Sequence, residues 1–150
     1  MKRSVVSVFA VFIVAAAVAF VSRPATKVEQ AFEGRPELVA ATFSSAWCPP
    51  CRILKPRLAK ALPAFRNAPV KFVDYDFTFG EIEKLRKEAA ADGLGAAFDR
   101  YSKATGFTLL VDAETGEVID ILTIDYSAKA MRASIERALA VAEATAPEAS

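Results

Sequence analysis

The chain has only two cysteines, Cys48 and Cys51, and the first of them directly follows its only tryptophan, Trp47. Two thiols with two residues between them can close a small disulfide ring where a helix begins, and can reopen it without a large backbone movement. At a helix N-terminus, unpaired N–H groups and the macrodipole favour a thiolate, which is the form that attacks another disulfide. The pattern predicts a redox site with Cys48 as nucleophile and Cys51 as resolving thiol. A static structural disulfide is poorly motivated, because so short a loop gains little stability from closure.

The two residues between the cysteines are both prolines and suit the start of a helix. Pro49 and Pro50 fix φ near helical values, and they fall in the first turn, where backbone N–H groups lack partners anyway. They also remove two backbone donors that could have stabilised a thiolate, whereas the N–H of Cys51 is still available. The dipeptide is expected to tune the redox pair, in a direction that the sequence does not give.

The residues on either side of the pair have two interpretations each. Trp47 is expected to shield one side of the site and to contact a partner chain, with an ordinary core aromatic as the alternative. Arg52 adds positive charge that could lower the pKa of the Cys48 thiol, although a solvated helix face is the simpler explanation.

Hydrophobic periodicity places this site between a strand and a helix. The run 38–44 is apolar and β-like, and apolar residues recur at helical spacing from Cys48 to about Ala61. Further strands and helices follow, and Ser127 is expected to cap the last helix. In chain order they are strand 70–76, helices 81–91 and 94–103, strand 107–112, a turn at 113–116, strand 117–123 and a final helix from 128.

The segment Leu38–Leu58 resembles the active-site segment of thioredoxin-fold proteins. It shares a hydrophobic strand, Trp-Cys-x-x-Cys, a basic residue and a proline, Pro56, five residues after the second cysteine; that proline kinks the helix because it cannot donate a hydrogen bond. The hexapeptide 47–52 is similar to the site of nucleoredoxins and tryparedoxins, and a membrane-tethered architecture is similar to TlpA-type thiol reductases. The resemblance is specific over 42–58 and extends in element order over 38–141. It implies an α/β thioredoxin-like fold, a central mixed β-sheet flanked by helices, preceded by an N-terminal hydrophobic helix.

The chain departs from the family at a buried acid. The family places an aspartate six residues before the first cysteine, where it is thought to relay a proton to the resolving thiol. This chain has Thr42 there, which we expect to be a core residue of the strand. Asp74 or Asp76 on the neighbouring strand, or water, then has to carry the proton.

A second departure concerns the substrate groove. The family carries a cis-proline just before its third strand, facing the cysteines, with adjacent backbone that pairs with the substrate chain. Aligning 107–111 with the usual segment puts Phe107 at that position. A cis bond before phenylalanine would cost about 3 kcal/mol, so we expect a trans Gly106–Phe107 bond in a rebuilt loop, which Gly106 permits. Gly106 and Phe107 are the expected groove residues.

Composition excludes several other kinds of chemistry. The 150 residues include no histidine, which removes Ser-His-Asp and Cys-His nucleophilic sites and His-based zinc sites. Two cysteines cannot fill a four-coordinate metal site within one chain, although a metal shared between two chains stays open as a minor alternative. We therefore expect no cofactor and no metal. A net charge of +1 gives no indication of nucleic-acid binding.

The first 22 residues have the pattern of a signal peptide or an N-terminal membrane anchor. Lys2 and Arg3 precede an apolar stretch, 5–21, that is long for a cleaved signal and near the minimum for a membrane span. Because such positive charges stay in the cytoplasm, we expect the domain on the outer side of the cytoplasmic membrane (in a bacterium, the periplasm), anchored through residues 4–22 or soluble. The predicted organisation is signal or anchor 1–22, linker 23–37, thioredoxin-like domain 38–141 and flexible tail 142–150.

The expected function is a thiol–disulfide oxidoreductase that reduces disulfides of exported proteins, because the resemblance is to TlpA-type reductases, which receive electrons from a membrane thiol carrier. The alternatives are a disulfide oxidase or isomerase, which donates its own disulfide, and a redox-inactive thioredoxin-fold binding module, which the missing cis-proline favours. The expected partners are disulfide-containing exported proteins, a membrane thiol electron donor and the membrane itself.

Overall fold

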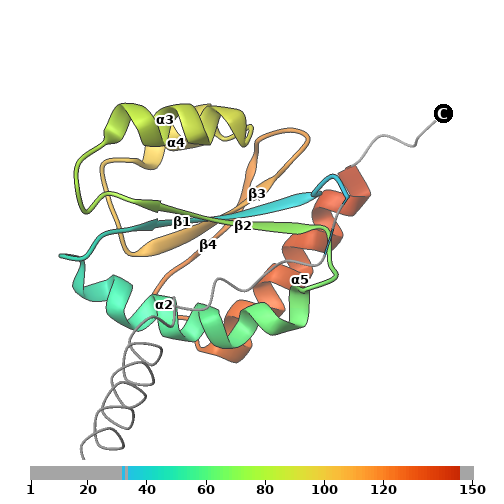
Figure 1. Ribbon diagram of the computed structural model, residues 1–150. Coiled ribbons are helices and arrows are strands. Elements are labelled where there is room, and N and C mark those ends of the chain that lie inside the picture. Colours follow the sequence, from blue (N-terminus) through green and yellow to red (C-terminus); the bar gives the residue numbers. More distant parts are fainter. Residues whose placement is uncertain (1–31, 33, 146–150) are drawn as a thin grey trace, which may run out of the picture.

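The computed structural model, which describes Phe32 and residues 34–145, is built around a four-stranded sheet (Figure 1). Its strands are β1 Leu38–Ser44, β2 Val70–Asp76, β3 Phe107–Asp112 and β4 Val118–Leu122. They lie in the order β2-β1-β3-β4. β1 runs parallel to β2 and antiparallel to β3, which pairs antiparallel with β4. This is the mixed sheet that the sequence predicts.

Helices cover both faces of this sheet. They are α2 Pro49–Ala61, the short 3-10 helix η1 Leu62–Phe65, α3 Ile82–Ala91, α4 Gly95–Tyr101 and α5 Ala128–Thr145. α2 and α5 lie on one face, and α3 and α4 lie on the other (Figure 1). The predicted order of strands and helices is confirmed for the described residues.

The central strand β1 explains the two-sided arrangement. Every residue of β1 is buried, and successive side chains of a strand point to opposite faces of the sheet. Leu38 and Ala40 join the core cluster with α2 and α5, whereas Val39, Ala41 and Phe43 join the cluster with α3 and α4. A strand without a polar face needs cover on both sides, so helices pack above and below it.

The start of α2 lies at the edge of the sheet where β1 and β2 end. Because these two strands are parallel, their C-terminal ends meet, with Ser44 opposite Asp76. The antiparallel β3 begins at the same edge, where Phe107 pairs with Phe43. A short loop, 45–48, leads from β1 into α2. The sheet therefore places the cysteines among the loops that follow β2 and precede β3.

The last helix is longer than the sequence predicts. Ser127 caps it as expected, since its Oγ accepts a hydrogen bond from the N–H of Ala130 at 3.2 Å. The helix continues to Thr145 because Ala142 is buried in the core and Thr145 Oγ1 donates to Asp112 Oδ2 at 2.6 Å. The helix therefore extends past the predicted domain boundary at 141, and residues 146–150 lie outside the described residues.

The N-terminal predictions fall largely outside the described residues. These are the hydrophobic segment 1–22 and most of the linker 23–37. The end of the linker contacts the domain, since the Glu37 N–H donates to Pro69 O at 2.8 Å and Arg35 pairs with Glu114 at 2.7 Å. Between residues 34 and 145, no helix is long and apolar enough to span a membrane.

Candidate active site

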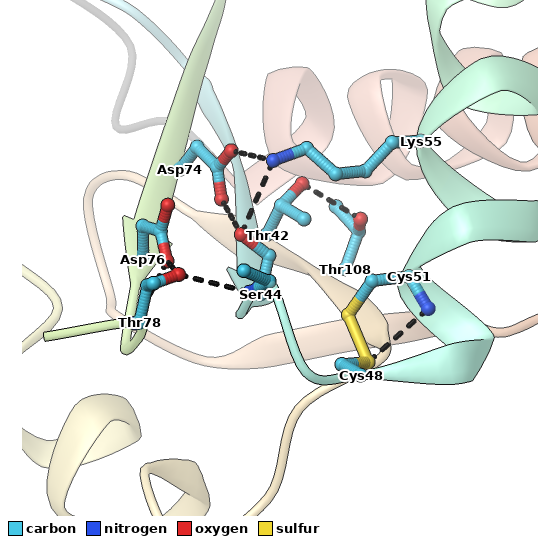
Figure 2. Close-up of polar contacts among 10 residues, drawn as sticks. Thr42, Ser44, Cys48, Cys51, Lys55, Asp74, Asp76, Thr78 and Thr108 are labelled. Carbon is cyan, nitrogen blue, oxygen red and sulfur yellow. Dashed lines mark hydrogen bonds and ion pairs between the residues drawn. A yellow bond between two sulfur atoms is a disulfide. The ribbon is translucent and has the colours of Figure 1, made fainter. Parts of the chain in front are cut away.

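Cys48 and Cys51 form a disulfide at the N-terminus of α2 (Figure 2). Their Cα atoms are 5.3 Å apart, and Cys48 is the residue that caps the helix, in extended conformation. Both residues are nearly enclosed, with relative exposures of 6% for Cys48 and 3% for Cys51. Of the two, Cys48 keeps the larger contact with solvent.

The Cys48 sulfur accepts a hydrogen bond from the backbone N–H of Cys51 at 3.1 Å. Pro49 and Pro50 occupy the first two positions of α2 and have no N–H to donate, so this N–H is the first donor of the helix. After reduction the same donor and the helix macrodipole would stabilise a negative charge on Cys48 Sγ. The geometry favours Cys48 over Cys51 as the nucleophile.

The other predicted residues of this segment take separate places on the helix and its loop. Trp47 is 77% exposed, so the alternative of a core aromatic is wrong. Arg52 is exposed on α2, in agreement with a solvated helix face. Pro56 lies inside α2, where it has no N–H to donate to the carbonyl of Arg52 one turn earlier.

Gly106 lies directly against the disulfide. A Cβ at this position would stand 3.3 Å from Cys48 Sγ and 2.8 Å from Pro50 Cβ, and its φ of +100° lies in the region that favours glycine. The described residues contain no cis peptide bond, so the predicted trans Gly106–Phe107 bond is confirmed. The Gly106 N–H donates to Phe43 O at 2.8 Å. That backbone donor is therefore already used within the domain.

A charged group lies between α2 and β2 (Figure 2). Lys55, one helical turn after Cys51, places its Nζ 2.6 Å from Asp74 Oδ2 and 3.3 Å from Ser44 Oγ. Ser44 Oγ donates to Asp74 Oδ1 at 2.6 Å. The side chains of Lys55 and Asp74 are both partly exposed, so this ion pair is in contact with solvent.

Thr42 is a core residue, as predicted. It is buried, and its Oγ1 lies 2.9 Å from Thr108 Oγ1 on the adjacent strand. This position, where the resemblance to thioredoxin-fold proteins would place an aspartate, therefore holds an uncharged pair of hydroxyls. Asp74 is the partner of Thr42 in the register of β1 and β2. A carboxylate therefore lies next to this position, on the neighbouring strand β2.

The loop before Cys48 is fastened to the loop after β2. The Ala46 N–H donates to Thr78 Oγ1 at 2.8 Å, and Figure 2 shows Thr78 next to Asp76. Thr78 in turn donates to Asp76 Oδ1 from its hydroxyl and, at 2.9 Å, from its N–H. The hydroxyl is the largest of the influences that hold the pKa of Asp76 below its ordinary value. Asp76 is thus an ionised anchor for the loop at neutral pH.

Sequence reasoning did not single out Thr78 or its neighbour Phe79. The signal was available in the predicted fold, since strands 38–44 and 70–76 end at the same edge. Residues that follow the second strand therefore have to lie near the cysteines that follow the first.

Three charged side chains, Lys55, Asp74 and Asp76, lie near this edge of the sheet. In the part of the chain that is described, no three His, Cys, Asp or Glu side chains are grouped so that they could hold a metal ion.

One protein family and several solved structures resemble this chain. The family model for Thioredoxin matches residues 23–91, just under half of the chain, whereas no curated protein matches it. Among solved structures it is similar to a thiol:disulfide interchange protein of the thioredoxin family from Chlorobium tepidum TLS, with 18% identity, a TM-score of 0.48, and coverage of 69% of this chain and 80% of that chain. It is also similar to StoA from Bacillus subtilis (18%, 0.46, 68% and 84%) and to Fasciola hepatica thioredoxin (21%, 0.43, 69% and 82%). The family match and the strand order together give a thioredoxin-like α/β fold, as predicted.

Replacing Gly106 with alanine tests its close approach to the disulfide. Gly93, in the turn between α3 and α4, has φ of +77° but nothing within 4 Å of an added Cβ, so Gly93→Ala measures backbone strain alone. We expect Gly93→Ala to lower the free energy of unfolding by about 1–2 kcal/mol. Gly106→Ala should cost a further ~1–3 kcal/mol, because Pro50 and Cys48 have to move.

Denaturant unfolding of the two oxidised variants gives both values. Only Gly106→Ala is expected to change the rate at which iodoacetamide alkylates reduced Cys48 as well. Equal costs for the two variants would contradict a tight contact at Gly106.

Proposed function

We propose that this chain is a thiol–disulfide oxidoreductase that reduces disulfides of other polypeptides through Cys48 and Cys51. The observation that carries the proposal is the enclosed disulfide at the start of α2, where Cys48 Sγ accepts the Cys51 N–H at 3.1 Å. A donor at this sulfur favours its thiolate, both as attacking group and as leaving group. The match of residues 23–91 to the Thioredoxin family supports the same chemistry.

The reaction proceeds in two exchange steps. The Cys48 thiolate attacks one sulfur of the substrate disulfide, so that a mixed disulfide forms and the other substrate sulfur leaves as a thiolate. The Cys51 thiolate then attacks Cys48 Sγ, which restores the Cys48–Cys51 bond and releases the second substrate sulfur. The substrate gains two electrons and the pair loses two. A thiol electron donor has to reduce the pair before the next turnover.

The second step needs a base for Cys51. Burial disfavours a thiolate, and Cys51 is 3% exposed. The neutral hydroxyl of Thr42 is not a carboxylate and cannot serve as this base. The Asp76 carboxylate is already hydrogen-bonded to Thr78. We assign the role to Asp74, through water, because it lies beneath the active-site helix, bonded to Lys55 and open to solvent.

The N-terminal sequence supports an exported location. Lys2 and Arg3 followed by the apolar stretch 5–21 fit a signal peptide or an anchor. On this proposal the domain works on the outer side of the cytoplasmic membrane, the periplasm in a bacterium. Its substrates are then exported proteins with disulfides, and its electron donor is a membrane thiol carrier.

Two alternatives remain distinct from this reductase. A disulfide oxidase or isomerase would use the same pair in the opposite direction. A redox-inactive binding module has one observation in its favour, because the Gly106 N–H is bonded to Phe43 O and so is closed to a substrate backbone.

Removal of the resolving thiol should trap the first intermediate. We expect reduced, full-length Cys51→Ser to accumulate a mixed disulfide with a peptide disulfide, because no second thiol can release Cys48. Cys48→Ser should form no such adduct, and the wild type should hold it only briefly. Intact-mass spectrometry under non-reducing conditions measures all three.

The same series separates the alternatives. Trapping by Cys48→Ser instead would exchange the roles of the two cysteines. Equal non-covalent binding of the peptide by the wild type and both variants, with no adduct, would favour the binding module.

Replacing Asp74 should slow the second step selectively. We expect Asp74→Asn to slow release of the substrate from the mixed disulfide by about tenfold or more near neutral pH, because an amide cannot accept the Cys51 proton. Formation of the mixed disulfide should change little. Rapid-quench kinetics with mass detection resolves the two steps.

Asp99→Asn is the matched control, because Asp99 is an exposed carboxylate of α4, on the opposite face of the sheet, paired with Arg86. It should affect neither step. If Asp74→Asn slowed both steps alike, or neither, Asp74 would not be the base.

A further inference from the structure

Positive charge is concentrated on the helix that follows the cysteine pair. Between Glu37 and Asp74 the chain has six Lys or Arg residues and no Asp or Glu, although its net charge is only +1. Five of the six lie on α2 or directly after η1: Arg52, Lys55, Arg57, Lys60 and Arg66. Acids prevail elsewhere, since the stretch 107–127 has five Asp or Glu residues and no Lys or Arg. The charge of the domain is therefore unevenly distributed, and α2 is its most basic element.

The outward face of α2 combines this charge with an apolar side chain. Arg52, Pro56 and Lys60 follow one another at intervals of four residues, so they lie on one side of the helix, and all three are exposed. Ile53 is 45% exposed and, three residues before Pro56, lies on the same side. Cationic side chains that reach lipid headgroups, with an apolar side chain beside them, favour binding to an anionic lipid surface.

Most of the charge on this face is not neutralised within the domain. Three of its cations form no ion pair in the described part of the chain, namely Arg52, Lys60 and Arg66. Lys55 pairs with Asp74, whereas Arg57 donates to two backbone carbonyls of the loop that carries Asp125. Lys55 and Arg57 are two residues apart and lie on opposite sides of the helix. The two acids therefore lie at the sides of the face and leave its centre cationic.

The described end of the linker joins the domain close to this face. The N–H groups of Glu37 and Leu38 donate to Pro69 O at 2.8 and 3.1 Å, and Pro69 comes only three residues after Arg66. In the proposed location, the anchor 1–22 is thus connected to the domain beside the end of η1. A tether at this point keeps α2 and η1 at a high effective concentration near the bilayer.

We propose that the outward face of α2, with the following Arg66, docks on the anionic phospholipid surface of the membrane that anchors the chain. The inference goes beyond the proposed redox function, although it uses the anchored location proposed with it. Arg52 and Lys60 supply the attraction along α2, and Ile53 adds an apolar contact. Docking holds the cysteine pair, at the start of the same helix, close to the bilayer and within reach of a membrane thiol carrier.

Energy transfer from Trp47 to a dansyl-labelled lipid tests this docking. Trp47 is the only tryptophan of the chain and lies just before α2, so its emission reports on this end of the helix. We reconstitute the oxidised full-length chain into vesicles of phosphatidylcholine, with and without phosphatidylglycerol. Transfer should be stronger in the anionic vesicles and should fall to the neutral level at high salt, because salt screens exposed charges. Equal transfer in the two kinds of vesicle would overturn the proposal.

Two triple variants locate the charges responsible. Removal of the three unpaired cations is expected to lower the ratio of docked to undocked chains roughly hundredfold and to abolish the difference between the vesicles. This variant combines Arg52→Gln, Lys60→Gln and Arg66→Gln. The control loses three exposed cations of α3 and α4, on the opposite face of the sheet, and should keep the difference. It combines Lys84→Gln, Lys87→Gln and Arg100→Gln. An equal loss in both variants would show a response to net charge alone and contradict the assigned face.

The transfer measurement is independent of the redox proposal. It uses oxidised protein and no thiol, so a cysteine pair that did not cycle would leave its result unchanged. Flotation with phosphatidylcholine vesicles tests the anchor by itself. If residues 1–22 do not hold the chain there, flotation of the same variants with the anionic vesicles measures the docking instead. Binding of poly-glutamate without a difference between the vesicles would assign the face to an acidic protein and overturn the proposal.

Discussion

Helix α2 begins with a sulfur where most helices have a hydroxyl, a carboxylate or an amide oxygen as cap. The two prolines that follow have no N–H, so the N–H of Cys51 is the first donor of the helix, and it bonds to Cys48 Sγ at 3.1 Å. The sulfur that completes the helix start is thus the sulfur to which we assign the proposed chemistry. If the donor keeps this position after reduction, the contact that caps the helix also stabilises a thiolate on Cys48.

The sheet edge decides what can reach this sulfur. Because β1 runs parallel to β2 and antiparallel to β3, the loops after β1 and β2 and the loop before β3 gather at one edge of the sheet. Gly106 closes one side, because an added Cβ would stand 3.3 Å from Cys48 Sγ. On another side the Trp47 and Phe79 loops are bonded together and open to solvent. The loops at this edge therefore restrict access to Cys48 at Gly106 and leave the side chains of Trp47 and Phe79 exposed.

Local signals in the sequence are sufficient to predict three of the strands, the cysteine pair and the peptide bond before Phe107. Strands 38–44, 70–76 and 107–112 were predicted with the bounds observed, because each is a dense apolar or β-branched run that ends at polar, Pro or Gly residues. The redox pair was readable because a Cys-x-x-Cys motif is contained in one helical turn. The trans bond before Phe107 followed from the cost of the cis form.

Contacts between distant segments could not be predicted in the same way. The exposure of Trp47 depends on how its loop leaves the sheet, and the pairing of Lys55 with Asp74 depends on which helix face meets β2. The link from Ala46 to Thr78 spans 32 positions. The extra turn of α5 depends on Asp112, 33 positions before Thr145. Each of these contacts depends on how distant helices, strands and loops are placed relative to one another, which no short stretch of sequence reveals.

The central claim is that Cys48 and Cys51 form a reversible redox pair poised to reduce other disulfides. The reduction potential of the full-length chain, equilibrated in glutathione or dithiothreitol buffers and read by thiol alkylation and mass, tests it most directly. We expect reversible two-electron cycling with a potential near or below about −250 mV. A potential near −120 mV would indicate an oxidant and contradict the proposed reducing direction. A cysteine pair that did not cycle at all would contradict the proposed oxidoreductase activity.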